Sequence, residues 1–230
     1  MLDRHPDLYL AKPFRPEPKF FLVDQVYAKG VSYYASTWFD GAPVSARAGE
    51  KSTDYLESAT AAERMARDVP RVKLVFILRN PVERAYSNYC WSRMNGLETE
   101  EFSTALVEEE RRERELPARL RFARPFSYFS RGLYADLLTP YFDRFAREQV
   151  LVLRFEDLLA DPRGLAARLH GFLGVDPRPE DAEGMGVINP SDPVAGGLSA
   201  DVRRRLADRY AEPNRRLALM LGSDFEWSPR

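Results

Sequence analysis

The apolar and polar positions divide the chain into short stretches that predict alternating strands and helices. Two runs of consecutive apolar residues, one within Lys73–Arg79 and one within Gln149–Phe155, are rich in β-branched residues and too short for a core helix. They predict buried strands, and "ARAGEKSTDYL" predicts a briefer strand that runs into a polar turn. Strands that alternate with helices favour an α/β class with a parallel sheet flanked by helices.

Helical periodicity accounts for most of the remaining chain. Helices are expected over Tyr27–Phe39, Ser58–Val69 with Ser58 as N-cap, 82–93, 98–115, 131–145, 156–175 and 199–222. Pro140 and Pro213 predict interruptions of the helices that contain them. Residues 1–22 are expected to be extended or looped and 116–130 to form a loop, and 176–197 to form a long loop that is either functional or disordered.

Length and charge narrow the class of protein. The 230 residues predict one domain spanning 1–230, and the formal charge of −1 gives no reason to expect a nucleic-acid partner. No apolar run approaches the roughly 20 residues of a membrane span, so no membrane partner is expected. Any anion site must therefore be built locally, and the oligomeric state stays open.

The rare residues narrow the chemistry further. Cys90 is the single cysteine, which predicts a buried thiol, no internal disulfide and a reducing, cytoplasmic setting. His5 and His170 are the only histidines, which argues against a histidine-rich metal site or a histidine-based triad.

The stretch "KLVFILRNPVERAYSNY" joins a predicted strand to a predicted helix through a two-residue turn. Ligands of parallel sheets lie beyond the carboxyl ends of strands, where helix N-termini present free N–H groups. Arg79 stands at such an end and could bind a phosphate, with Ser87 about one and a half turns into the helix as a second donor. Arg79 could equally pair with a carboxylate, and Arg84 could join the site or pair with Glu83.

Two further motifs each contain a charged residue that could take part in the chemistry. Lys51 in "GEKST" is a flexible ammonium near a strand end that could neutralise a transferring anionic group, although the chain has no G-x-x-x-x-G-K-[ST] phosphate loop. Glu17 stands between two prolines, and Arg15 and Lys19 would hold it ionised as a proton acceptor. The alternative for Glu17 is an ordinary surface carboxylate in a proline-rich arm.

Taken in order, these motifs resemble the sulfotransferases that use 3′-phosphoadenosine 5′-phosphosulfate (PAPS), in particular the branch with heparan sulfate sulfotransferases and bacterial relatives. The family patterns "HP…KEPxFF", "EKTPxY" and "hhhLRxPxxRxxSxY" read here as "HPDLYLAKPFRPEPKFF", "EKSTDYL" and "VFILRNPVERAYSNY". The resemblance continues through "RGLYADLLTPYFDRFAREQVLVLRFEDLLADP" to "EPNRRLALMLGSDFEW" and covers nearly all of the chain from His5 onward.

The resemblance implies a P-loop-NTPase-like fold and sulfuryl transfer from PAPS to a hydroxyl of a carbohydrate or small metabolite, without a metal. It makes Glu17 the base and places Lys51 at the transfer centre. Arg79 and Ser87 would bind the 3′-phosphate, and Gly196 and Gly197 would let backbone N–H groups approach the nucleotide. The alternatives are a non-catalytic protein that binds the desulfated donor (PAP) or an anionic sugar, and a nucleotide-dependent kinase. The kinase lacks support because neither a Walker loop nor a carboxylate pair for Mg²⁺ is evident.

The sequence departs from the family pattern at two places. Pro16 and Lys19 stand where the family has Lys before the base and commonly His after it, so Lys12, Arg15 or Lys19 would have to supply the missing charge. The family's first strand and phosphate loop precede the "HP" element, whereas here only four residues precede His5. We therefore expect a native polypeptide that is longer at its N-terminus.

Overall fold

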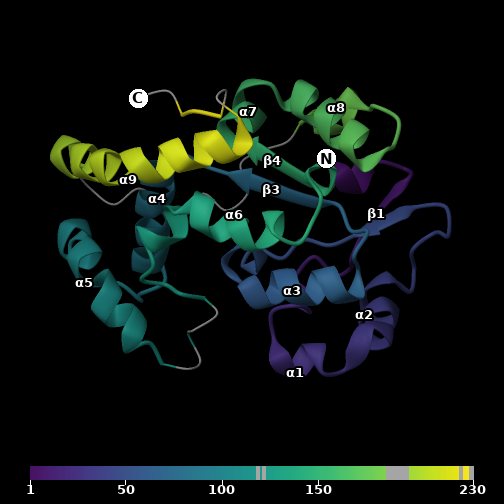
Figure 1. The fold of residues 1–230 in the computed structure, drawn as a ribbon, viewed down its shortest axis with the longest axis horizontal. Helices are drawn as coiled ribbons and strands as arrows, with labels where there is room; N and C mark the ends of the chain where they lie inside the picture. The colour runs from purple at the N-terminus through teal and green to yellow at the C-terminus, as the bar shows by residue number, and fades with distance from the viewer. Residues whose placement is uncertain (118–119, 121–122, 185–196, 223–224, 228–230) are drawn as a thin grey trace. The chain divides into compact units, whose positions relative to one another are not determined.

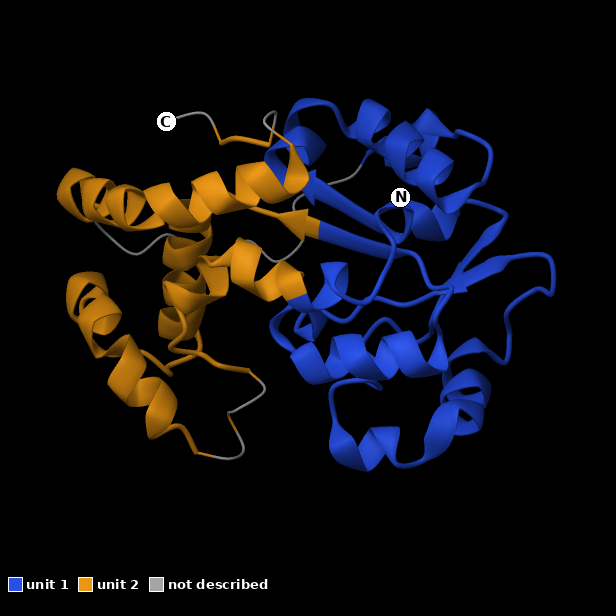
Figure 2. Cartoon of the chain, viewed as in Figure 1, with its two compact units in different colours: residues 1–76, 140–186 blue, residues 77–139, 187–230 orange. Residues whose placement is uncertain are grey.

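The computed structural model describes residues 1–117, 120, 123–184, 197–222 and 225–227. The chain forms two compact units, coloured separately in Figure 2. Unit 1 consists of residues 1–76 and 140–186, and unit 2 of residues 77–139 and 187–230. Each unit is thus assembled from two segments that are far apart in the sequence, whereas the expectation of one domain over 1–230 stays a prediction.

Two small parallel sheets contain the four strands of the described residues. β1 (Leu8–Leu10) pairs in parallel with β2 (Arg47–Gly49). β3 (Leu74–Leu78) pairs with β4 (Val150–Arg154), and Figure 1 shows both arrows pointing the same way. The expected strands are confirmed, and β1 lies within residues 1–22, which were expected to be extended or looped. β3 is also less buried than expected, because Ile77 is 48% exposed.

Unit 1 contains the short helices α1 (Asp24–Tyr27), α2 (Gly30–Phe39), α3 (Ala59–Asp68), α7 (Phe155–Ala160) and α8 (Pro162–Leu173). Of these, α3 and α8 begin at a residue whose side chain caps the helix. The predicted cap of α3 is confirmed, since Ser58 accepts a hydrogen bond from the N–H of Ala61. α8 ends at Gly174 with φ of +73°, a left-handed conformation that glycine adopts without strain.

Unit 2 contains α4 (Pro81–Met94), α5 (Phe102–Arg114), α9 (Ala200–Leu221) and most of α6 (Tyr134–Phe142). The expected breaks at Pro140 and Pro213 are wrong, because both prolines lie inside continuous helices. A proline in a helix costs about 3 kcal/mol. Around Pro213 this cost is offset by burial on both sides of the residue, where Leu206 and Leu217 are each 1% exposed. None of the described helices has both the length and the apolarity needed to cross a membrane.

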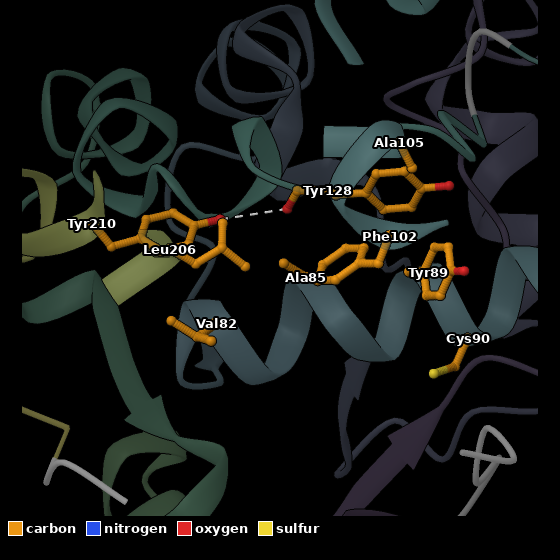
Figure 3. Packing of buried hydrophobic residues seen from close by; sticks show 9 residues of the cluster. All are labelled: Val82, Ala85, Tyr89, Cys90, Phe102, Ala105, Tyr128, Leu206 and Tyr210. Carbon is orange, nitrogen blue, oxygen red and sulfur yellow. Dashed lines mark hydrogen bonds between the residues drawn. The ribbon is translucent and has the colours of Figure 1, made fainter. Parts of the chain in front are cut away.

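The core of unit 2 forms around one side of α4 (Figure 3). Its buried residues are Val82, Ala85, Tyr89, Cys90, Phe102, Ala105, Tyr128, Leu206 and Tyr210. The prediction of a buried Cys90 thiol is confirmed, with 3% of the residue exposed. Because an α-helix turns once in about 3.6 residues, Ser87 lies on the side of α4 that faces away from Val82 and Ala85. The core thus packs against the side of α4 opposite to Ser87.

Candidate functional site

Glu17 and Lys51 form the first part of the site, in unit 1. The ammonium of Lys51 donates a hydrogen bond of 2.6 Å to Oε1 of Glu17. The two side chains differ in exposure, because 74% of the Lys51 side chain is exposed but only 14% of the Glu17 side chain. A carboxylate held in a partly buried position therefore meets a cation that reaches it from solvent.

Thr53 completes the surroundings of Glu17. Its backbone N–H and its hydroxyl both donate to Oε2 of Glu17, at 3.1 and 2.8 Å. Two residues beyond Glu17, Lys19 donates its backbone N–H to Oγ of Ser52 at 3.0 Å, and its ammonium forms an ion pair with Asp54 at 2.5 Å. Four consecutive residues, 51 to 54, thus hold the segment that carries Glu17.

These contacts determine the protonation state of Glu17. Burial by itself raises its pKa, but hydrogen bonds from Lys51 and Thr53 and the positive charge of Lys51 outweigh burial, so the pKa lies below the usual value. Glu17 is therefore an ionised carboxylate at neutral pH. The expectation that Lys19 holds it ionised is corrected, since Lys51 is its cationic partner and Lys19 pairs with Asp54.

Aromatic packing fixes the chain just after Glu17. Phe20 and Phe21 are 0% and 3% exposed. The ring of Phe20 stacks on Tyr34 of α2 with centroids 4.4 Å apart, and Phe21 packs edge-on against Tyr55 at 6.0 Å. Burial of a Phe side chain contributes roughly 1.5–3 kcal/mol, so the two rings anchor the segment in the core of unit 1.

Arg79 and Asn80 form the turn between β3 and α4. Arg79 follows the last residue of β3, is half-buried, and accepts a hydrogen bond of 2.8 Å from the Tyr134 hydroxyl at its carbonyl. The side chain of Asn80 accepts from the N–H groups of Val82 and Glu83 at 3.0 and 3.4 Å.

This cap corrects one expectation about the turn. The sequence suggested that free N–H groups of the helix would face the ligand, but Pro81 has no N–H and Asn80 occupies the next two. An anion at this helix N-terminus would therefore have to be bound by side chains, and Arg79 is the cation next to the cap.

Ser87 and Arg84 have different settings on α4. Ser87 is half-buried, on the side of α4 away from the core. Arg84 donates to the carbonyl of Tyr128, and Glu83 forms its ion pair with Arg203 rather than with Arg84. The choice left open for Arg84 is thus decided against an ion pair with Glu83, and its guanidinium holds the backbone of unit 2.

Of the predicted glycine pair, Gly196 and Gly197, the structure describes one residue. Gly196 lies outside the described residues, whereas Gly197 has φ of +65°, a conformation that favours glycine. The structure thus brings Glu17 and Lys51 together in unit 1, and places Arg79, Ser87 and Gly197 in unit 2. Sequence reasoning missed Thr53, which carried no signal, and Asn80, which did carry one, since Asn followed by Pro is a helix-start pattern.

Comparisons with known proteins identify relatives of the whole chain. A family model described as a sulfotransferase domain matches residues 51–185. Heparan sulfate glucosamine 3-O-sulfotransferase 3B1 of Mus musculus is 28% identical over 246 residues, covering 97% of this chain and 59% of that protein. Carbohydrate sulfotransferase 15 of Rattus norvegicus is 26% identical over 185 residues, covering 69% of this chain and 31% of that protein.

A solved structure gives the same result for the fold. The crystal structure of a sulfotransferase from Alicyclobacillus acidocaldarius matches with a TM-score of 0.74 and 29% identity, covering 96% of this chain and 87% of that one. The α/β fold class is thereby confirmed as that of a sulfotransferase. The chain spans about three fifths of the length of its first two curated relatives.

Proposed function

The chain belongs to the sulfotransferase family, and we propose that it moves a sulfuryl group from PAPS to a hydroxyl of a carbohydrate or small-metabolite acceptor. Glu17 acts as the base, Lys51 stabilises the transferring group, and Arg79 and Ser87 bind the 3′-phosphate. The proposal rests on one observation above all, the 2.6 Å contact between an ionised carboxylate and an exposed ammonium.

The hydrogen bonds of Glu17 to the described residues leave one acceptor position on its carboxylate for a hydroxyl that donates a proton. A carboxylate offers about four acceptor positions. Among the described residues Lys51 takes one on Oε1, and Thr53 takes both on Oε2. One position on Oε1 stays open, and an acceptor hydroxyl that donates there is held with its oxygen ready for attack.

The proposed reaction accounts for every atom and electron pair without a metal or a redox partner. The acceptor oxygen forms a bond to sulfur while the bond from sulfur to the 5′-phosphate oxygen breaks, and PAP leaves with the electron pair. The acceptor proton passes to Glu17. Because the hydroxyl becomes more acidic as its bond to sulfur forms, a carboxylate with a low pKa is a sufficient base.

Lys51 is suited to a change of partner during this reaction. Its side chain is 74% exposed, so the ammonium can turn from Glu17 to the negative charge of the donor. That movement removes a hydrogen bond and a positive charge from Glu17, which raises the pKa of the carboxylate and makes it a stronger base. Donor binding and base activation are thereby linked through one side chain.

Arg79 and Ser87 supply the phosphate contacts of the proposal. A guanidinium makes two parallel hydrogen bonds to a phosphate, and a hydroxyl adds a third. The side chains must carry this recognition because Asn80 occupies the N–H groups at the start of α4. Gly196 and Gly197 remain part of the proposal as residues that let the backbone approach the nucleotide.

The names of the relatives support a carbohydrate acceptor. One is named for the glucosamine of heparan sulfate and another for carbohydrates. We therefore propose that a sugar hydroxyl is the first acceptor to test, ahead of small-metabolite alcohols.

The experiment measures sulfate transfer and donor binding in parallel. Wild type and Glu17→Gln are incubated with ³⁵S-labelled PAPS and a panel of heparan sulfate oligosaccharides, simple sugars and alcohols, while calorimetry measures binding of PAP, ATP and GTP. We expect PAP to bind both proteins and transfer to fall by about 10²–10⁴ in Glu17→Gln. Equal transfer by both proteins would place the base elsewhere. PAP binding without any transfer would favour the non-catalytic alternative, and ATP binding in place of PAP would favour a kinase.

A further inference from the structure

Glu50 lies directly before Lys51 and is surrounded by hydroxyl groups. Oε1 accepts hydrogen bonds from the hydroxyls of Tyr34 and Tyr55 at 2.8 and 2.7 Å, and Oε2 accepts one from Ser52 at 2.7 Å. Among the described residues its hydrogen-bond donors are these three neutral hydroxyls. Such an arrangement fits a residue that organises its surroundings rather than one that forms a surface ion pair.

Two of these hydroxyls also contact the backbone that follows Glu17. Oγ of Ser52 accepts the backbone N–H of Lys19 at 3.0 Å, and the hydroxyl of Tyr55 accepts that of Phe21 at 3.2 Å. Each hydroxyl thus donates to Glu50 and accepts from the backbone. Two parallel links therefore run from one carboxylate to two alternate peptide groups of the segment 19–21.

The direction of both links follows from the acceptor oxygens of Glu50. A hydroxyl has a single hydrogen, and when that hydrogen points to a carboxyl oxygen the lone pairs are left for another donor. Because Glu50 accepts from Ser52 and Tyr55, it orients both hydroxyls so that they can accept backbone N–H groups. Without the carboxylate each hydroxyl can rotate, and the N–H groups of Lys19 and Phe21 lose a fixed acceptor.

The backbone at Lys19 shows that this segment has to be held in place. Lys19 has φ of +46°, a left-handed conformation that costs a residue with a side chain free energy and persists where surrounding contacts impose it. The bond from its N–H to Ser52 and the ion pair with Asp54 help to impose it. Glu17 precedes this residue by two positions, so its carboxylate depends on the same conformation.

We propose that Glu50 is a positioning residue of the sulfuryl-transfer site, which acts through the hydroxyls of Ser52 and Tyr55 to hold the segment that carries Glu17 against Lys51 and Thr53. The inference rests on the proposed function for its catalytic meaning. Its structural content, a carboxylate that fixes two backbone N–H groups, stands independently of any activity.

The first test measures the backbone directly. Glu50→Ala removes the acceptor of both links, and we expect the amide hydrogens of Lys19 and Phe21 to exchange with solvent about ten-fold faster or more, while amides of α8 keep the wild-type rate. Ser52→Ala is the second variant, which removes only the link to Lys19 and should leave Phe21 protected. If Glu50→Ala does not fold, Ser52→Ala still decides whether the link exists.

A matched control separates this role from general stability. Glu98 in unit 2 is a buried carboxylate that also accepts a tyrosine hydroxyl, from Tyr128 at 2.6 Å. Glu98→Gln should change the unfolding midpoint without changing exchange at Lys19 and Phe21. Wild-type exchange at both amides in Glu50→Ala would overturn the proposal.

Kinetics then connect the backbone effect to the reaction. With ³⁵S-labelled PAPS and an oligosaccharide acceptor of the panel, Glu50→Ala should lower kcat by on the order of ten- to a hundred-fold, with PAP affinity and the acceptor KM within about three-fold of wild type. Ser52→Ala should cost less in the Glu50→Ala background than in wild type, because both changes break the same link. An unchanged kcat, or additive effects, would remove Glu50 from the reaction. A wild-type protein without transfer would refute the proposed function, while the exchange result would still decide the positioning of Glu17.

Discussion

The ammonium of Lys51 lies 2.6 Å from the carboxylate of Glu17, although 34 positions separate the two residues in the chain. The residues next to Lys51 strengthen this contact, since Ser52, Thr53 and Asp54 each bind the segment 17–19. The contact is therefore a property of two segments that are held together along their length. Its chemical meaning can be tested one residue at a time.

Replacing Lys51 should change both the pKa of Glu17 and the rate of sulfate transfer, and the two effects can be measured separately. In Lys51→Ala the pKa of Glu17 rises, because the carboxylate loses its ion pair while burial remains. Sulfate transfer should fall by about 10²–10³, since the transferring group loses its stabilising cation. ¹³C NMR of the Glu17 carboxyl measures the first effect, and ³⁵S transfer the second. Lys51→Arg keeps the charge and should retain the low pKa; a Glu17 pKa unchanged in Lys51→Ala would contradict the assignment.

Arg79→Ala should weaken PAP binding by about ten- to a hundred-fold, the loss of one charge-assisted pair. Calorimetry provides the dissociation constants. Arg204→Ala serves as the control, since it removes an exposed guanidinium, 71% accessible, from α9 in the same unit. Equal PAP affinity in wild type and Arg79→Ala would exclude this guanidinium from the phosphate site.

Two substitutions of Asn80 should distinguish its role as a helix cap from the binding of an anion at the same turn. Asn80→Ala should lower the free energy of unfolding by about 1 kcal/mol, because two N–H groups of α4 lose their acceptor. Asn80→Asp keeps the cap but adds a negative charge beside Arg79, so stability should be retained while PAP affinity falls. Urea unfolding and calorimetry measure the two quantities. PAP affinity that Asn80→Asp leaves intact would argue against a phosphate at this turn.

His170 should make the stability of the protein sensitive to mildly acidic pH. The residue is fully buried, Nδ1 accepts the N–H of Arg178 at 3.1 Å, and the ring of His5 lies 4.7 Å away. Burial and the nearby charges of His5 and Arg178 lower its pKa, so the folded state prefers the neutral ring.

Proton binding to the folded and unfolded chain determines whether the stability rises or falls with pH. Below the ordinary histidine pKa of about 6.5, the unfolded chain binds a proton that folded His170 does not. The stabilisation is therefore complete above that value and declines as the pH falls towards the lowered pKa, by at most about 1.4 kcal/mol per pH unit. Urea midpoints at pH 7.5 and 5.5 should differ more for wild type than for His170→Asn, which removes the titrating ring; equal differences would contradict the prediction.

The sequence allowed local structure to be predicted well where a single segment determines it. The N-cap at Ser58, the strands β3 and β4 and the turn at Gly174 all follow from residues next to one another. The prolines at 140 and 213 were misjudged because intrinsic helix propensity is a weak guide that packing in the fold can override.

The sequence indicated candidate residues for the site but not the hydrogen bonds that join them. Glu17 and Lys51 were singled out from their local motifs, and the family resemblance then assigned their roles. The bonds of Glu17 to Thr53, and of Glu50 to Tyr34, instead join segments up to 36 positions apart. Such bonds depend on the folded backbone and leave no periodic trace. Asn80 is the exception, since an asparagine before a proline could have been read as a cap.

The two hydrogen bonds from Thr53 to Oε2 of Glu17 have a consequence for regioselectivity if Glu17 is the base. A sugar ring presents several hydroxyls of similar acidity, and the one that loses its proton would have to approach the other carboxylate oxygen, Oε1. The site of modification on a polyol would then be chosen by the approach angle at one oxygen atom. Changing Thr53 to a residue without a hydroxyl would open a second direction and broaden the pattern of products.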